Sequence, residues 1–512
     1  MWARTDRLKL VPVSPDGEAE TSPRDVAVID VGSNSVRLVI YRVEGRTLWT
    51  VFNEKVLAGL GRDLARTGCL SPEGVTAALG ALRRFRALLD AVKPAQVFTA
   101  ATAAVREARD RAAFLEQVQA ETGFVLRVLT GAEEAHYSAL GVAAGSPQAD
   151  GIVGDLGGSS LELVQLQRGR PGEGVTLPLG PFALGAPGPI DPRALGGACE
   201  AMLGTVADRF RGQTFHAVGG AWRNLAIVRM NRINYPLQVV QGFEMSAAEA
   251  VETAGLLAGL SRGSLERIAG ISRKRAETLP YAAVVLKALV DRMGFERIVI
   301  SAYSLREGLL FDSLPESLRA LDPLVEGCGA LAARNGVAER LGQALEAWLA
   351  PLWDRLAPAF PDGRESVLVA AACRLADVGS RLHPDHRADL VFEEVLRAPI
   401  PGQSHPERTF LAMTAFHRYG GERSPEQATV ERVLTPERLQ RAEVLGAAIR
   451  LGCQLSGRSP ELLAASSLAR TRTELTVSVR KDAADLLLGE QTSKRAEALA
   501  RTLDLELKVR VK

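Results

Sequence analysis

Cysteine is scarce in this sequence and shows neither metal-binding nor disulfide spacing. Five cysteines occur among 512 residues, an odd number, and no two of them form a C-x-x-C pair. This scatter excludes a zinc ribbon and a disulfide framework, because both need closely and regularly spaced cysteines. Reduced thiols are typical of the cytosol, so we expect a cytoplasmic protein. The five are Cys69, Cys199, Cys328, Cys373 and Cys453.

An excess of one charge and long apolar runs are also missing. Lys and Arg number 62 against 60 Asp and Glu, a net charge of +2, so no global basic field favours nucleic acid. Apolar runs such as 281–287 are interrupted by charge well short of the about 20 residues that a membrane span needs. The charged N-terminus lacks the apolar segment of a secretory signal. We therefore expect neither nucleic acid nor a membrane as a partner.

The length predicts several domains, because single hydrophobic cores stop growing beyond about 250–300 residues. Strand and helix patterns alternate from 25 to 311, with strands expected at 26–31, 36–43, 47–52, 96–100 and 125–129. No convincing strand pattern occurs from 315 to about 467, whereas 474–479 and 503–511 alternate at period two around a helical stretch. The predicted divisions are a flexible arm at 1–24, α/β domains at 25–146 and 147–311, a helical domain at 312–467 and a small β-α-β domain at 468–512.

One motif occurs twice, once in each predicted α/β domain. It reads VAVIDVGSNSVRLVI at 26–40 and GIVGDLGGSSLELV at 151–164, each time an apolar strand, an Asp, glycines with hydroxyl residues, and a second apolar strand. Glycines let backbone amides approach and cradle phosphate oxygens, and Asp30 or Asp155 would suit a hard cation that bridges those oxygens. A plain β-hairpin turn would explain either copy alone, but the pair favours an enzyme that handles phosphate.

Three further segments offer candidate groups. Glu133 and Glu134 open a helix, where acids are common because of the helix dipole, but where a carboxylate beside a phosphate cleft can also act as a general base. Arg106 follows a strand end, where it could fork two phosphate oxygens or pair with an acid at the surface. The Gly-Gly turn at 219–220 ends a strand of the second domain and could contact phosphate or a base.

Taken in order, these motifs resemble those of the exopolyphosphatase/guanosine pentaphosphate phosphohydrolase family. The segments are VIDVGSNSVRLVIY, ATAAVREA, LTGAEEAHYSALGV, GDLGGSSLELV, AVGGAWRNLA and SLREGLL, which cover about 25–311 strongly and the rest more loosely. The resemblance implies an α/β fold with two actin-like (ribonuclease-H-like) domains around a cleft. It also implies that an all-α domain similar to the HD phosphohydrolases and a small α+β C-terminal domain follow.

The resemblance implies roles for individual residues as well. The catalytic group would comprise Glu134 as general base, Glu162, and Arg106, which would neutralise charge in the transition state. Asp155 and Glu162 would hold Mg²⁺, or Mn²⁺ in its place, and Asp30 would position the metal or its waters. The residues implied in phosphate binding are Gly32, Ser33, Asn34, Ser35, Gly157, Gly158, Ser159, Gly219 and Gly220.

The sequence departs from the family pattern at several positions. Ala103 stands where the family often has Ser, Leu161 replaces a Thr, and Ala221 replaces the Thr of a Gly-Gly-Thr motif, which weakens nucleotide recognition. In the helical domain Ala376 precedes Asp377 where an active HD site has His, so we expect a degenerate site without a metal pair. The other histidines of this domain, expected to be structural or to contact a polyanion, are His383, His386, His405 and His417.

We therefore interpret the sequence as an exopolyphosphatase that releases terminal orthophosphate from inorganic polyphosphate by Mg²⁺-dependent hydrolysis, with Glu134 activating the water. Hydrolysis of the 5′ γ-phosphate of guanosine pentaphosphate is the close alternative, since family members do either or both. An actin-fold kinase or ATPase is a more distant alternative, which the Glu-Glu-Ala motif and the altered Gly-Gly-Thr motif disfavour. The resemblance also implies a homodimer.

Overall fold

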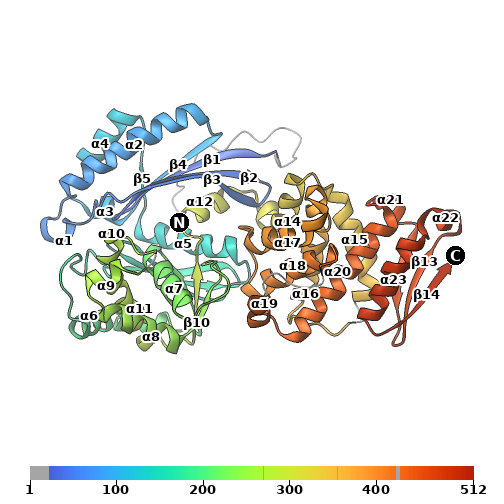
Figure 1. Ribbon diagram of the computed structural model, residues 1–512. Coiled ribbons are helices and arrows are strands. Elements are labelled where there is room, and N and C mark those ends of the chain that lie inside the picture. Colours follow the sequence, from blue (N-terminus) through green and yellow to red (C-terminus); the bar gives the residue numbers. More distant parts are fainter. Residues whose placement is uncertain (1–21, 269, 354–355, 422–426) are drawn as a thin grey trace, which may run out of the picture.

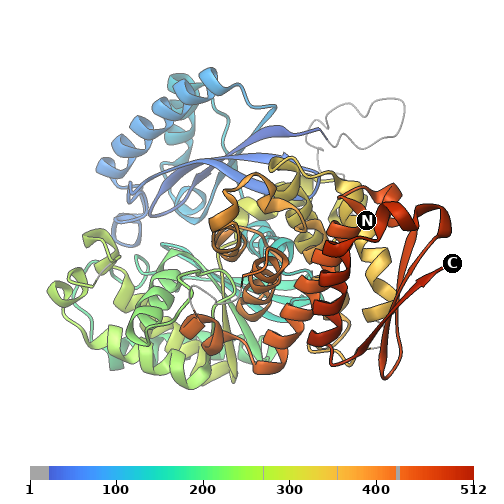
Figure 2. The ribbon, with the colours of Figure 1, turned by 45° about the vertical axis from the view of Figure 1, so that its right-hand side comes forward.

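The computed structural model describes residues 22–512 except 269, 354–355 and 422–426. The predicted arm at 1–24 therefore lies almost wholly outside the described residues. Two α/β halves, a helical region and a three-stranded tail follow one another along the chain (Figure 1). The helical region lies beside both α/β halves (Figure 2), since its core includes Trp49 of the first half and Leu237 of the second.

The first half is built on a five-stranded sheet in which one central strand has neighbours of both directions. Its strands are β1 (Arg24–Val31), β2 (Val36–Glu44), β3 (Thr47–Val56), β4 (Gln96–Ala101) and β5 (Arg127–Val128), in the order β3-β2-β1-β4-β5. β1 pairs antiparallel with β2 and parallel with β4. Successive side chains of a strand face opposite sides of its sheet. Helices cover both of these faces at β1. These helices are α2 (Pro72–Val92), α4 (Arg111–Thr122), α5 (Gly131–Gly145) and α12 (Leu305–Ser313).

The second half repeats this arrangement. Its strands are β6 (Gly151–Leu156), β7 (Leu161–Gln167), β8 (Arg170–Leu177), β9 (Thr214–Val218), β10 (Glu244–Ser246) and β11 (Arg297–Ser301), in the order β10-β11-β9-β6-β7-β8. Two hairpins are again followed by a strand that pairs parallel with the first strand, here β9 with β6. The principal helices are α6 (Pro192–Gly204), α7 (Gly220–Arg232), α8 (Ala247–Gly259) and α11 (Leu279–Met293).

Strand β8 lies in a stretch whose glycines and prolines give no strand signal in the sequence. It contains Pro171, Gly172 and Gly174, residues that are depleted in strands. β8 is the edge of its sheet, where a proline costs no ladder hydrogen bond, because that side of the strand has no partner. Tertiary pairing with β7 therefore overrides the local preference.

Helix α12 returns the chain from the second half to the first. It packs closely against α5, and Leu309 and Leu310 of α12 share a core with Val26 and Val28 of β1. The buried hydroxyl of Tyr41 in β2 donates a hydrogen bond to Glu307 of α12. The N-terminal end of α12 is thereby fixed between the two sheets.

The helical region and the tail share one core. The helices are α14 (Pro323–Arg334), α15 (Glu339–Trp353), α16 (Arg364–Arg374), α17 (Arg387–Arg397), α18 (His405–Arg418), α19 (Gln427–Val433), α20 (Pro436–Ser456) and α23 (Glu490–Thr502). The tail strands are β12 (Ser466–Arg470), β13 (Glu474–Val479) and β14 (Glu506–Val511). β12 is a strand beyond the predicted β-α-β pattern. The sequence did not predict it, because SSLAR carries a single buried apolar residue, Leu468, and so gives no period-two signal.

Short helices connect these elements, and none of the helices described is both long and apolar enough to cross a membrane. The short helices are α1 (Leu64–Thr67), α3 (Ala103–Glu107), α9 (Arg262–Glu266), α10 (Arg273–Ala276), α13 (Glu316–Arg319), α21 (Pro460–Leu463) and α22 (Ala484–Leu487).

Candidate active site

The two predicted phosphate turns have the same backbone and touch each other. In the first turn the amide of Gly32 donates to the carbonyl of Ser35 at 2.9 Å, and in the second the amide of Gly157 donates to the carbonyl of Ser160 at 2.9 Å. A Cβ atom on Gly158 would lie 3.0 Å from the Cβ of Ser33, so only glycine lets the turns approach this closely. The two halves of the molecule therefore meet at their glycine turns.

A polar cleft opens between these turns. Most of the residues predicted for phosphate and metal line it, together with groups that the sequence analysis did not select. The predicted residues in its wall are Asp30, Gly32, Ser33, Asn34, Ser35, Glu134, Asp155, Gly157, Gly158, Gly219 and Gly220. The additional charged and polar residues are Arg37, Lys55, Thr102, Ser160, Arg223, Asn224, Arg275, Ser304 and Arg306.

The two adjacent acids of α5 have different surroundings. Glu133 closes a capping box with Thr130, and it also accepts from Arg127 at 2.5 Å. Burial works to raise the pKa of Glu133, but hydrogen bonds from Thr130 and Arg127 prevail and lower it. Glu133 thus starts the helix and is held in its charged form.

Glu134 points into the cleft. It is 7% exposed, and Nη1 of Arg106 donates to its Oε2 at 2.8 Å. The pKa of Glu134 is raised to about 7, and burial is the main cause. The hydrogen bond and charge of Arg106 oppose the rise, whereas the charges of Asp155 and Asp30 add to it. A carboxylate with a pKa near 7 can take a proton from water at neutral pH.

Two more acids lie beside Glu134. Asp155 is the next-to-last residue of β6, and it accepts from the hydroxyl of Ser138 at 2.6 Å. Glu162, opposite Asp155 in the hairpin register, is 1% exposed, and its Oε1 has no hydrogen-bond partner. Burial raises the pKa of both carboxyls, and for Glu162 the charges of Glu134 and Asp155 raise it further. Neighbouring acids without a cation between them favour protonation in this way.

Positive groups also line the cleft. Nη1 of Arg306 donates to Asp30 at 2.7 Å, which neutralises that carboxylate. Desolvation within the cleft and, next to it, the charges of nearby arginines, Arg275 foremost, together lower the pKa of Lys55 to about 7. Burial likewise lowers the pKa of Arg223 to about 10. The repulsion among crowded cations of this kind decreases when a polyanion binds between them.

The Gly-Gly turn positions one of these cations. Gly219 has φ of 117°, and a Cβ there would lie 2.6 Å from the carbonyl oxygen of Leu156, so glycine is required. Helix α7 begins directly after it and carries Arg223 into the cleft. Arg275 donates to the carbonyl of Gly220 at 3.2 Å and so braces the turn from outside.

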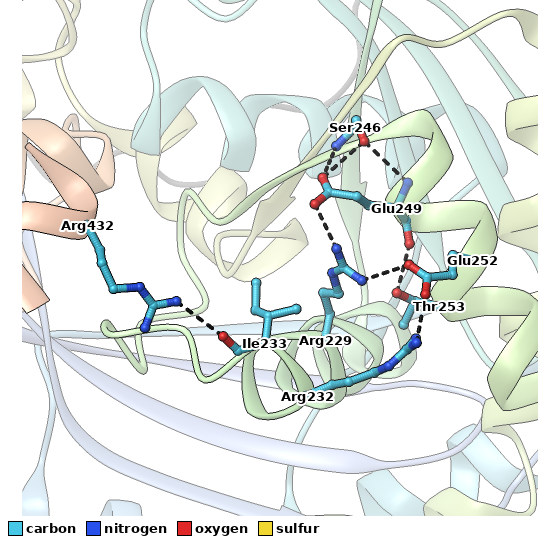
Figure 3. Close-up of polar contacts among 8 residues, drawn as sticks. All are labelled: Arg229, Arg232, Ile233, Ser246, Glu249, Glu252, Thr253 and Arg432. Carbon is cyan, nitrogen blue, oxygen red and sulfur yellow. Dashed lines mark hydrogen bonds and ion pairs between the residues drawn. The ribbon is translucent and has the colours of Figure 1, made fainter. Parts of the chain in front are cut away.

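The far end of α7 is also fixed. Arg229 donates to Glu249 at 2.7 Å and to Glu252 at 2.9 Å, and both acids belong to α8 (Figure 3). Arg432 of α19 donates to the carbonyl of Ile233 at 3.2 Å, which ties the end of α7 to the helical region (Figure 3). α7 is therefore held at both ends, with Arg223 at the cleft.

Three predicted residues lie behind the cleft wall. Arg106 contacts Glu134 and the carbonyl of Leu129, so it holds the acid in place and does not face the cavity. Glu162 and Ser159 are buried next to the wall, and the Ser159 hydroxyl has no hydrogen-bond partner. Sequence patterns could have found Arg37, since it faces Asp30 in the hairpin register. Arg306 lies in the SLREGLL motif, but nothing local indicates that it pairs with Asp30.

The acids of the second turn fit a magnesium ion. Among the described residues no group of three or more His, Cys, Asp and Glu side chains is arranged to hold a metal. Mg²⁺ usually binds one or two carboxylates and completes its shell with water and substrate phosphates, so it does not need three. Asp155 in the cleft wall and the unpaired Oε1 of Glu162 offer such oxygens, whereas Asp30 is already neutralised by Arg306.

One histidine of the helical region joins that region to the second half. His405 is 3% exposed, and its Nδ1 lies 2.8 Å from the hydroxyl of Tyr235. Its Nε2 lies 3.1 Å from the carbonyl oxygen of Gln241, so the ring accepts from the hydroxyl and donates to the carbonyl. Burial lowers the pKa of His405 to about 4, which keeps this interdomain contact uncharged at neutral pH.

Comparisons with known proteins agree with the motifs. The model of the Ppx/GppA phosphatase family matches residues 39–317, and that of the exopolyphosphatase C-terminal region matches 361–508. An uncharacterised protein of Streptomyces coelicolor is 30% identical over 300 residues, which are 56% of this chain and 88% of the relative.

Solved structures resemble the two α/β halves. The Aquifex aeolicus member of the Ppx/GppA family is 26% identical, with a TM-score of 0.50, over 56% of this chain and 97% of that one. An exopolyphosphatase from Cytophaga hutchinsonii, with 22% identity and a TM-score of 0.53, covers 57% of this chain and 99% of its own and shows the fold alone.

The site and these matches define a phosphatase of the actin-like α/β class. The chain belongs to the Ppx/GppA phosphatase family, whose model covers more than half of it. The family predicted from the ordered motifs is thus confirmed, as is the actin-like α/β fold followed by a helical region.

Proposed function

We propose that this chain is an exopolyphosphatase that removes the terminal phosphate of inorganic polyphosphate with the help of Mg²⁺. One observation carries the proposal: Glu134 lies in the cleft where both glycine turns meet, and cations line the same cleft. A terminal phosphate cradled by the turns would sit next to a base and beside positive charge. Phosphoryl transfer depends mainly on such positioning and electrostatic stabilisation.

The chain's own residues would act as follows. Amides of the two turns hold the oxygens of the terminal phosphate, and Arg223 and Lys55 balance the charge of the chain behind it. Glu134 accepts a proton from the attacking water, and Arg106 keeps the carboxylate aimed at that water. The water oxygen bonds to the terminal phosphorus while the bond from that phosphorus to the bridging oxygen breaks. The bridging oxygen keeps the electron pair on the shortened chain, and orthophosphate leaves. Asp155 and Glu162 would hold Mg²⁺, which supplies charge neutralisation at the phosphate oxygens.

Guanosine pentaphosphate is the alternative substrate of the same site. Ala221 lines the cleft next to the Gly-Gly turn and offers no hydroxyl to a nucleotide. The cations of the wall serve any phosphate chain, whatever is attached to it. We therefore expect kcat/KM to be higher for polyphosphate. A kinase or ATPase role has no comparable support, and an HD-like helical fold and a homodimer stay predictions.

The test compares two neighbouring acids in the full-length protein. Glu134→Gln should lower kcat for orthophosphate release from polyphosphate by about 10²–10⁴-fold, because it removes the base and keeps the shape. Glu133→Gln is the matched control: it weakens the helix cap and should leave kcat within a few-fold. Near-normal turnover by Glu134→Gln would exclude this mechanism. A higher kcat/KM for guanosine pentaphosphate would assign the alternative substrate.

A further inference from the structure

The helical region gathers four arginines far from the active site. We call Arg418, Arg450, Arg458 and Arg495 the arginine cluster. Arg418 ends α18, Arg450 lies on α20, Arg458 follows α20, and Arg495 lies on α23. These three helices pack against one another in the order α18, α20, α23, which brings the four side chains together. The cluster adjoins Asp377, the acid that follows Ala376 where an active HD site would have its histidine.

The carboxylate of Asp377 balances only one of the four positive charges of the arginine cluster. Nε of Arg458 lies 3.0 Å and Nη2 of Arg418 lies 3.4 Å from Oδ1 of Asp377, which is only 8% exposed. Neither Arg450 nor Arg495 forms an ion pair with any acid among the described residues, and Nε of Arg495 is buried without a hydrogen-bond partner. The count is therefore four positive charges against one negative charge.

This excess is partly buried and not simply dispersed in solvent. Burial, together with the charges of Arg495 and Arg418, lowers the pKa of Arg450 to about 10. Like charges held together in a partly desolvated place are costly unless an anion joins them. Guanidinium groups present planar pairs of N–H donors that match the oxygens of a phosphate group. The missing partner should thus be a compact anion with several oxygens.

We propose that the arginine cluster is a second anion site, which binds a phosphate group at the place of the degenerate HD centre. The site is distinct from the cleft, because none of its residues lines that cleft. Its ligand is free orthophosphate or the terminal phosphate of a short oligophosphate, and both offer the same oxygens to the guanidiniums. The inference does not depend on hydrolysis in the cleft, so it would stand even if the proposed function failed.

The experiment counts bound phosphate on the full-length protein. Equilibrium dialysis with radiolabelled orthophosphate, and separately with tripolyphosphate, is done on Glu134→Gln so that turnover does not consume the ligand. We expect two classes of site for at least one of the two ligands. Adding Arg450→Gln with Arg495→Gln should weaken one class by about tenfold or more and leave the other unchanged. Binding of tripolyphosphate alone would identify a chain end as the ligand, and binding of orthophosphate would identify the free ion.

A matched control lies on the same helix. Arg501→Gln removes one charge from α23 at an exposed position, whereas Arg495→Gln removes one within the arginine cluster. Arg501→Gln should change neither class. Without added phosphate, Arg450→Gln should melt at the same temperature as the parent or higher, because it relieves repulsion. A single class of site, or equal weakening by Arg501→Gln, would overturn the proposal. So would a lower melting temperature combined with unchanged phosphate binding, which would show a purely structural cluster.

Discussion

The two glycine turns share a backbone and differ in charge. Each turn is closed by an amide-to-carbonyl bond of 2.9 Å, and each follows a strand whose next-to-last residue is Asp. In the hairpin register Asp30 faces Arg37, whereas Asp155 faces Glu162. Arg306 donates to Asp30, whereas the hydrogen bond to Asp155 comes from the neutral hydroxyl of Ser138. Arg37 in place of an acid, together with the distant Arg306, thus makes the first turn neutral, whereas the second turn is acidic.

This difference suggests how a duplicated motif can serve two purposes. The first turn, with its aspartate neutralised, is suited to hold phosphate oxygens directly. The second turn accumulates carboxylates that repel one another until a cation joins them. A phosphate chain lying between the turns would meet amides and arginines at the first turn and, at the second, the pair of acids proposed to hold Mg²⁺.

Substituting the aspartate of each turn should give the largest difference in activity between the two turns. Asp155→Asn should lower kcat/KM for polyphosphate by about 100-fold, and raising Mg²⁺ should restore part of it, because a metal ligand is lost. Asp30→Asn should cost about tenfold or less, since Arg306 already neutralises that group. Initial rates over a Mg²⁺ series check both. Equal losses with no response to Mg²⁺ would refute the division of roles.

The raised pKa of Glu134 should also change how the free energy of unfolding depends on pH. The pKa of Glu134 rises from its ordinary 4.5 to about 7 on folding, so its favourable contribution is complete below 4.5 and is lost as pH rises through 7. In EDTA, Glu134→Gln should match the wild type near pH 4.5 and be more stable at pH 8, by on the order of 1–2 kcal/mol. Denaturant unfolding at the two pH values measures this.

The neighbouring acid supplies the control with the opposite sign. The pKa of Glu133 is lowered on folding, so its contribution is present above 4.5 and is lost as pH falls through the lower folded value. Glu133→Gln should therefore be less stable than the wild type at neutral pH. If both substitutions changed stability in the same direction at pH 8, the surroundings assigned to the two acids would be wrong.

The smallest effect is expected at the cationic side of the first turn. Arg37→Gln should raise KM for polyphosphate by about tenfold with little change in kcat, because one of several cations in the cleft wall is lost. The effect should shrink as salt is added, since screening weakens the contribution of the wild-type arginine. Steady-state kinetics at two ionic strengths checks this. A large fall in kcat at unchanged KM would instead place Arg37 at the reacting phosphate.

Most of the cleft could be predicted because its parts are local. Asp, glycines and hydroxyls that follow one another on a hairpin keep their relation wherever the hairpin lies, so Asp30, Asp155 and the turns were found in the sequence. The helix start offered Glu133 and Glu134 together, and the family resemblance singled out Glu134. The structure shows why the two acids differ: Glu133 is used by the helix cap. The edge strand β8 and the strand β12 were missed, because sheet pairing overrides weak local propensity.

The sequence by itself determined the family, the duplicated turns and the groups that can bind phosphate, since these depend on residue type and short spacing. Only the tertiary structure decided which charges meet. Arg306 reaches Asp30 across 276 residues, and Arg106 was expected in the cleft but lies behind Glu134. Such contacts depend on how α12 returns to the first sheet and how α5 packs on it. Packing of distant elements fixes them, and no local pattern in the chain encodes their geometry.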